Sequence, residues 1–218
     1  MKILKRTLIL CALFCSLSFV VYGCSSSDNN TDSAPIPTET AVETEKKAIN
    51  APTAEETEEK KKNKDIFNDD NIKTFELSSD DLHEGVWDTI ITNTANGSNV
   101  SPHLKWEPVP DAECYAVYMI DTTAGNWLHW ESYGLTETEL PQGWANEDEY
   151  VGPCPPGDTH SYEIYVVALK KNVELTNLNY DGSNIFFSKL ASELDVYDNT
   201  EGNVISYGHI KGTYTYGD

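Results

Sequence analysis

The chain has 218 residues, of which 36 are Asp or Glu and only 15 are Lys or Arg, so its formal net charge is −21. The six basic residues from Phe67 onward are all lysines. Nucleic acid and anionic lipid surfaces would repel so acidic a chain, which excludes nucleic-acid binding as its function.

The N-terminal residues have the pattern of an export signal. Three basic residues among the first six precede an apolar run at 8–22. That run is shorter than the ~20 residues of a membrane-spanning helix, which favours a signal peptide. It ends in VYGC at 21–24, which resembles a bacterial lipobox. We therefore expect a lipoprotein signal peptide at 1–23 and lipidation of Cys24, which would hold the protein on the outer face of a bacterial membrane. An ordinary signal peptide with an incidental cysteine is the alternative.

Residues 24–65 are rich in Ser, Thr, Glu, Lys and Pro and contain almost no large apolar side chain. Such a segment cannot bury enough surface to offset the entropy lost on ordering. We expect a disordered tether, whose root-mean-square span would be about 35 Å for some 40 flexible residues.

Residues 66–218 are long enough for one domain with its own core. Aromatic and β-branched runs separated by Gly, Asn and Pro clusters predict strands. These runs are FELSS at 75–79, SNVSP at 98–102, CYAVYMID at 114–121, WLHWESY at 127–133, SYEIYVVAL at 161–169 and HIKGTYTY at 209–216. One helix is expected at 184–198, where Ile185, Leu190 and Leu194 are spaced close to the helical period. The pattern indicates a mainly antiparallel β-sandwich with a C-terminal helix.

The strand that begins near His160 places two polar side chains on one face. Alternation puts His160 and Tyr162 on that face and Ser161 and Glu163 on the other. Both His160 and Tyr162 lie where a loop enters the sheet, a position at which binding sites form.

Two further polar side chains lie at strand ends. Asp121 closes the run at 114–121, and alternation puts His129 on one face with Trp127 and Glu131. Each candidate also has a purely structural explanation. Asp121 could cap the following turn, His129 could be a satisfied core histidine, and Tyr162 could simply pack.

These residues belong to a longer series of short motifs. In chain order the motifs are NVSPHLKW at 99–106, VP at 109–110, a strand ending at Asp121, WLHW at 127–130, GPCPPG at 152–157, HSY at 160–162 and GHIKGTY at 208–214. Together they resemble the phosphatidylethanolamine-binding protein (PEBP) family, and in particular its bacterial branch, often called Raf-kinase-inhibitor-like. The resemblance extends from about Phe75 to the C-terminus.

The resemblance implies a β-sandwich with a small surface pocket for an anion, such as phosphate or a phospholipid head group. We expect no catalysis, cofactor or metal. The pocket residues that the resemblance implies are Asp121, His129, Pro155, Pro156, His160 and Tyr162. Imidazole N–H groups and a phenol O–H can donate to phosphate oxygens. An ionised Asp121 can only accept, so we expect it to orient a histidine or to bind an ammonium group.

The sequence departs from the family pattern at two places. Residues 121–125 read DTTAG where the family usually has Asp-Pro-Asp-x-Pro, and Ser161 stands where the family usually has Arg between the His and the Tyr. Alternation turns Ser161 away from the pocket. We therefore expect weak phosphate affinity.

Three other functions remain open. Asp121, His160 and Cys154 could form a hydrolase site, although the sequence has no nucleophile motif such as G-x-S-x-G. Asp121, His129 and His160 have the ligand types of a metal site, but not closely spaced ligand motifs. Finally, the domain could be a surface interaction module with a vestigial pocket. The sequence does not indicate which protein partner would bind.

An exported chain could also form a disulfide between Cys114 and Cys154. Cys114 precedes Asp121 by seven residues, or roughly 23 Å of extended strand. Because Cys154 would lie in the pocket loop, and bridged Cα atoms must lie within about 7 Å of each other, we expect no disulfide.

Overall fold

The computed structural model describes residues 65–216. The expected signal peptide, Cys24 and all of the expected tether except Asp65 therefore lie outside the described residues. Within them, no helix is both long enough and apolar enough to cross a membrane.

The described residues form short and long strands, one α-helix and two 3₁₀ helices. In chain order they are β1 (Lys73–Phe75), β2 (Leu77–Ser78), β3 (Leu82–His83), β4 (Val86–Trp87), η1 (Thr89–Ile91), β5 (Leu104–Trp106), β6 (Cys114–Asp121), β7 (Trp127–Leu135), β8 (Glu139–Leu140), β9 (Thr159–Leu169), α2 (Phe187–Ala191), η2 (Ser192–Asp195), β10 (Val196–Tyr197), β11 (Thr200–Glu201) and β12 (Val204–Thr215).

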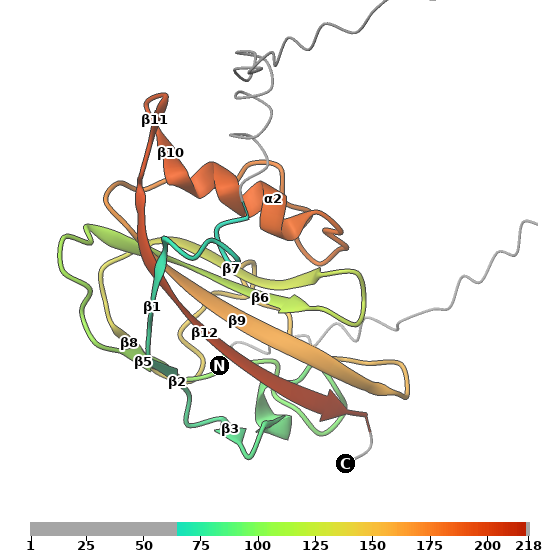
Figure 1. Cartoon of the computed structure of the whole chain (residues 1–218). Coiled ribbons are helices and arrows are strands. Elements are labelled where there is room, and N and C mark those ends of the chain that lie inside the picture. Colours follow the sequence, from blue (N-terminus) through green and yellow to red (C-terminus); the bar gives the residue numbers. More distant parts are fainter. Residues whose placement is uncertain (1–64, 217–218) are drawn as a thin grey trace, which may run out of the picture. The chain divides into compact units, whose positions relative to one another are not determined.

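Seven strands form the large sheet, in which β3, β4, β12, β9, β6 and β7 follow one another and β1 also pairs with β12 (Figure 1). The long pairings β12–β9, β9–β6 and β6–β7 are antiparallel, whereas β1 and β4 run parallel to β12. Strands β2, β5 and β8 form a smaller antiparallel sheet.

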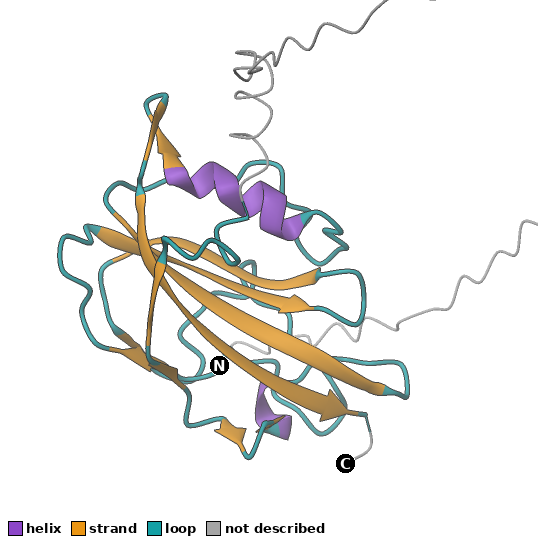
Figure 2. Ribbon diagram, viewed as in Figure 1, coloured by secondary structure: helices purple, strands orange, loops and turns teal. Residues whose placement is uncertain are grey.

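Each face of the large sheet covers its own core. On one face, side chains of β6, β7 and β9 pack against Leu77, Leu104 and Leu140 of the small sheet. On the other face, Tyr118 and neighbouring side chains pack against Phe187 of α2. Figure 2 shows the helix on one side of the long strands. The domain is therefore a β-sandwich with a C-terminal helix, as the sequence predicted, and the helix covers the outer face of the large sheet.

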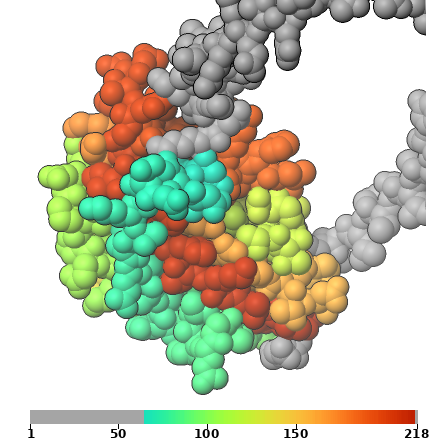
Figure 3. Space-filling view, viewed as in Figure 1, coloured from blue at the N-terminus to red at the C-terminus, as the bar shows by residue number. Residues whose placement is uncertain are grey.

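The start of the described chain belongs to the helical layer. Ile66 is fully buried, and the ring of Phe67 stacks on that of Phe187. In the space-filling view, the teal start of the chain borders the orange residues around α2 (Figure 3).

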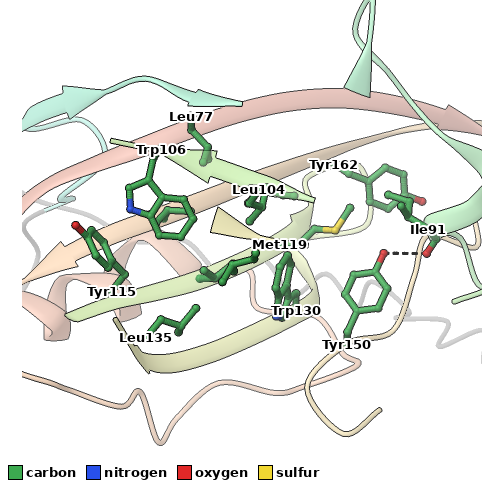
Figure 4. Packing of buried hydrophobic residues seen from close by; sticks show 14 of the residues in the cluster. Leu77, Ile91, Leu104, Trp106, Tyr115, Met119, Trp130, Leu135, Tyr150 and Tyr162 are labelled. Atoms are coloured by element: carbon green, nitrogen blue, oxygen red, sulfur yellow. Dashed lines mark hydrogen bonds between the residues drawn. The ribbon is translucent and has the colours of Figure 1, made fainter. Parts of the chain in front are cut away.

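Strand β6 explains why the sheet can be covered on both faces. Every residue from Cys114 to Asp121 is buried, which matches its nearly continuous apolar sequence. On the small-sheet side, Met119 packs close to Trp130 and Tyr150, and the hydroxyl of Tyr150 donates to the carbonyl of Ile91 at 2.9 Å (Figure 4). The three long strands predicted from the sequence are confirmed as β6, β7 and β9.

The expected helix at 184–198 was too long, and its apolar stripe was wrong at Ile185, whereas Leu190 is half-buried and Leu194 is buried. The α-helix spans Phe187–Ala191, η2 continues it to Asp195, and Val196 already begins a hairpin strand. Ile185 is 71% exposed. Asn184 explains the late start, because its backbone N–H and side chain are hydrogen-bonded to neighbouring loops.

The expected strand at 98–102 is also wrong, because these residues are irregular and β5 begins only at Leu104. Asn99 adopts a positive φ of 52°, which interrupts an extended chain. Its backbone N–H donates to Thr92, and its side chain accepts from Gly152.

The core position Ile164 provides a test of this packing. Ile164 lies fully buried in β9, so Ile164→Ala should lower the free energy of unfolding by about 2–5 kcal/mol. The same substitution at the exposed Ile185 should change it by no more than about 0.5 kcal/mol. Chemical denaturation of both variants measures the difference, and equal losses would contradict the described core.

Candidate functional site

Four polar side chains converge where β6, β7 and β9 meet the connecting loops. Asp121 is the last residue of β6, and it lies opposite Tyr162 of β9 on one side and Trp127 of β7 on the other. His160 precedes Tyr162 by two residues on the same face of β9. The sheet register thus brings together residues that are up to 41 positions apart in the sequence (Asp121 to Tyr162).

Both carboxylate oxygens of Asp121 are engaged. Oδ1 accepts from the backbone N–H groups of Thr123 at 2.8 Å and Ala124 at 3.0 Å. Oδ2 contacts Nδ1 of His160 at 2.5 Å. The turn-capping role and the histidine-orienting role considered from the sequence are therefore both correct, and one carboxylate performs them at once.

The contact with Asp121 determines how His160 can meet a ligand. A carboxylate that already accepts two N–H groups acts as an acceptor, so Nδ1 of His160 carries the hydrogen. The other ring nitrogen, Nε2, is then the one available to a ligand. It is an acceptor in the neutral imidazole and a donor in the imidazolium.

His129 is placed by a bulge in β7. Met119 pairs with Trp130 and Ile120 pairs with Leu128, so His129 is the extra residue between them. Its ring lies edge-on to that of Tyr162, with centroids 5.3 Å apart.

Because of the bulge, the face expected for Glu131 of β7 is wrong. His129 does share a face with Trp127, as predicted, because Trp127 pairs with Asp121. Glu131, however, pairs with Tyr118 and lies on the α2 side of the sheet. The extra residue reverses the alternation beyond it, and strict period two does not hold through the strand.

The protonation of His129 follows from its partner and its burial. Nδ1 lies 2.7 Å from the carbonyl oxygen of Val151, which can only accept, so Nδ1 carries the hydrogen. Burial lowers the pKa of His129 below its ordinary value, against smaller opposing effects of the Val151 hydrogen bond and the Asp121 charge. His129 is therefore neutral near pH 7, with Nε2 as an acceptor.

Tyr162 lies between the two imidazoles and is itself buried. Burial, followed by the nearby Asp121 carboxylate and the Cys154 thiol, raises the pKa of the Tyr162 phenol well above its ordinary value. The phenol therefore keeps its proton and can act only as a hydrogen-bond donor or neutral acceptor.

The proline-rich loop is anchored at its start. The N–H of Gly152 donates to Oδ1 of Asn99 at 2.7 Å, and the carbonyl of Pro153 accepts from the N–H of Asn93 at 3.0 Å. A Cβ at Gly152 would come within 2.2 Å of the Ile91 carbonyl oxygen, so only glycine fits there.

Further along this loop, Pro155 is buried, whereas Pro156 is exposed. Their contact with a ligand, like that of the four polar side chains, remains a prediction. The sequence did not single out Val151 or Asn99. The N-V-S-P run hinted at Asn99 only through its place in a motif, and a backbone carbonyl such as that of Val151 has no sequence signal.

The two departures from the family pattern lie in contact with each other. Oγ1 of Thr123 accepts from the backbone N–H of Ser161 at 3.0 Å, and the carbonyl of Ser161 accepts from the N–H of Thr122 at 2.9 Å. These bonds tie the turn after β6 to the start of β9. The alternation expected for β9 is confirmed, because Glu163 lies on the opposite face with His209 at 2.9 Å and Lys211 at 3.0 Å.

The remaining chemistry of the described residues is limited. Among them, no group of three or more His, Cys, Asp or Glu side chains is arranged to hold a metal ion. Cys114 is buried in the helical-layer core and Cys154 is exposed in the loop, and the two do not form a disulfide.

Comparison with known proteins shows relatives across the described domain. A 31% identical relative from Methanothermobacter thermautotrophicus, named UPF0098 protein, aligns over 57% of this chain and 88% of its own length. UPF0098 protein YbhB of Escherichia coli is 30% identical over 44% of this chain and 79% of its own length.

Solved structures are also similar. A homologue of phosphatidylethanolamine-binding protein from Chlamydia trachomatis, CT736, is 24% identical with a TM-score of 0.48, and covers 65% of this chain and 97% of its own. YbcL of E. coli, described as a new member of the mammalian PEBP family, is 22% identical with a TM-score of 0.46, and covers 65% of this chain and 98% of its own.

The family assignment rests on the match to the family as a whole. The sequence model described as phosphatidylethanolamine-binding protein matches residues 63–215, which is more than half of the chain and includes every residue of the candidate site. The chain belongs to the phosphatidylethanolamine-binding protein family.

Proposed function

We propose that this protein is a membrane-anchored, extracytoplasmic binding protein that holds phosphate or a phospholipid head group at the site formed by Asp121, His129, His160 and Tyr162, without catalysing a reaction on it. The observation that carries the proposal is the 2.5 Å contact between His160 and Asp121, which leaves the second imidazole nitrogen of His160 available to a ligand. Pro155 and Pro156 would form one wall of the site.

The hydrogen-bonding state of the site favours binding a phosphate together with a proton. Both neutral imidazoles offer Nε2 as an acceptor, because Nδ1 of each is committed to Asp121 or Val151. A phosphate monoester with its second pKa near 6 can supply the missing proton itself. A fully ionised phosphodiester would need at least one imidazolium. In either case binding should be tighter at lower pH.

An Asp–His pair like Asp121 and His160 occurs in binding sites and also in hydrolase triads, so the case against catalysis depends on the nucleophile. The raised pKa of Tyr162 keeps its phenol protonated, and it is therefore a poor nucleophile. In a hydrolase, the exposed Cys154 beside the site would be the nucleophile. Its position in the anchored loop is equally compatible with lining a binding site.

Phosphate titration tests the proposal. We expect His160→Ala to weaken inorganic phosphate binding roughly tenfold to 100-fold, because it removes a charge-assisted hydrogen bond. His83→Ala, which removes an exposed histidine on β3, should leave the affinity unchanged. Calorimetry or NMR titration measures both, at about pH 6 and about pH 8, with tighter binding expected at the lower pH.

If phosphate and phosphoethanolamine bind equally well to wild type and to His129→Ala/His160→Ala, the binding proposal fails. The interaction-module alternative would then gain support.

The lowered pKa of His129 gives a second prediction. Its imidazole should titrate below 6.5 in the folded chain and near 6.5 in denaturant. Because unfolded His129 takes up a proton at higher pH than folded His129, its contribution to the free energy of unfolding is complete above about pH 6.5 and falls as the pH drops toward the folded pKa. NMR of the ring protons gives both midpoints, and a folded midpoint at or above the denatured one would contradict this description of the site.

The anchor is tested at Cys24. Cys24→Ser should abolish lipidation and release the protein from the membrane fraction, because the thiol carries the lipid. Intact mass and membrane fractionation of both forms measure this, with Cys154→Ser as the matched control that should stay lipidated. A wild-type chain without added lipid mass would refute the anchor and leave the phosphate site untouched.

A further inference from the structure

Two of the largest exposed apolar side chains stand next to each other at the start of the helical layer. Ile185 is 71% exposed and Phe186 is 70% exposed. The flanking residues are the opposite, since Asn184 and Phe187 are both buried. An isolated exposed apolar residue needs no explanation, but an adjacent pair of this size marks a candidate contact surface.

The pair is held firmly. The backbone N–H of Asn184 donates to the carbonyls of Gly125 and Asn126, and its side-chain Nδ2 donates to the carbonyls of Asn179 at 3.0 Å and Gly182 at 2.9 Å. The side chain of Phe187, the first residue of α2, packs into the core between the helix and the large sheet. Ile185 and Phe186 are therefore displayed on a fixed turn between two anchored residues, and little conformational entropy remains to be lost on contact.

A second exposed pair lies at the other end of the same layer. Val196 is 42% exposed and Tyr197 is 47% exposed, and both belong to the β10–β11 hairpin that directly follows η2. Figure 1 shows α2 and this hairpin on the same side of the large sheet. We refer to Ile185, Phe186, Val196 and Tyr197 together as the α2 apolar surface.

The N-terminal segment enters the domain at this layer. Phe67 stacks on Phe187 with ring centroids 5.9 Å apart, and the carbonyl of Phe67 accepts from the hydroxyl of Tyr207 at 2.7 Å. The first described residues thus lie against Phe187 of α2, which directly follows Ile185 and Phe186 in the sequence.

We infer that the α2 apolar surface rests on the lipid membrane to which the chain is anchored. The inference depends on the lipid at Cys24 proposed above. A lipid at Cys24, some 40 residues before the first described residue, would keep the domain at a local concentration on the order of millimolar near that membrane, so even a weak surface contact becomes populated. Exposed aromatic and aliphatic side chains bind at the boundary of head groups and acyl chains.

Charge restricts the kind of membrane. The chain carries a net charge of −21, and in the hairpin Asp198 follows Tyr197 and Glu201 pairs with Val196. An anionic surface would repel this layer, so the partner is a neutral or zwitterionic lipid surface.

One end of the α2 apolar surface adjoins the turn that carries the candidate site. Nδ2 of Asn126 donates to the carbonyl of Ile185 at 3.4 Å, and Asn126 belongs to the turn that Asp121 caps. The site residue Tyr162 packs on the small-sheet face, whereas α2 packs on the other face of the large sheet.

Fluorescence quenching tests the inference on the full-length lipidated chain in phosphatidylcholine vesicles with brominated acyl chains. The Phe186→Trp variant should lose roughly twofold or more of its added fluorescence relative to unbrominated vesicles. The matched control is Ile90→Trp, at an exposed position on η1 next to Ile91, which is buried in the core on the opposite face of the large sheet. Its added fluorescence should be unchanged.

Tyr197→Trp gives an independent reading at the second exposed pair, should Phe186→Trp fail to fold as judged by circular dichroism. Equal quenching at the control and at the α2 apolar surface in a lipidated chain would overturn this inference alone. A chain without lipid at Cys24 would overturn the inference and the anchor together. A titration that shows no phosphate binding would leave both unaffected.

Discussion

The contact between His160 and the buried carboxylate of Asp121 is the constraint on which the candidate site depends. It crosses from β9 to β6, and the same carboxylate also caps the turn into β7 through Thr123 and Ala124. Three segments are thus held by one side chain. Because Asp121 is almost fully buried, these hydrogen bonds offset the cost of removing its carboxyl group from water, and they hold the site residues in place.

This rigidity has a chemical consequence. The hydrogens on Nδ1 of His160 and His129 are used inside the protein, so the imidazoles present acceptors until they are protonated. Burial makes protonation of His129 harder. If the site binds phosphate as proposed, it should distinguish ligands by the protons they bring as well as by their negative charge.

The unusual residues of the chain reinforce each other. Thr122, Thr123 and Ser161 replace the proline-containing turn and the arginine typical of the family, and they are joined by backbone and side-chain hydrogen bonds. These hydrogen bonds connect the turn after β6 to the start of β9, at the place where the family usually has a proline-containing turn. On the far side of the same turn, Asn184 anchors Ile185 and Phe186, so the proposed membrane contact and the binding site share one structural support.

The sequence by itself determined the long strands β6, β7 and β9, the shared face of His160 and Tyr162, and the family. The strands and the shared face depend on the apolar pattern and the alternation within single segments, and the family depends on the order of short motifs along residues 99–214. Only the tertiary structure decided the bulge that turns His129 and Glu131 to opposite faces, since a bulge is set by the register with β6. Tertiary contacts also shortened the helix after Asn184 and supplied the Val151 carbonyl, because hydrogen bonds between distant segments leave no periodic trace in the chain.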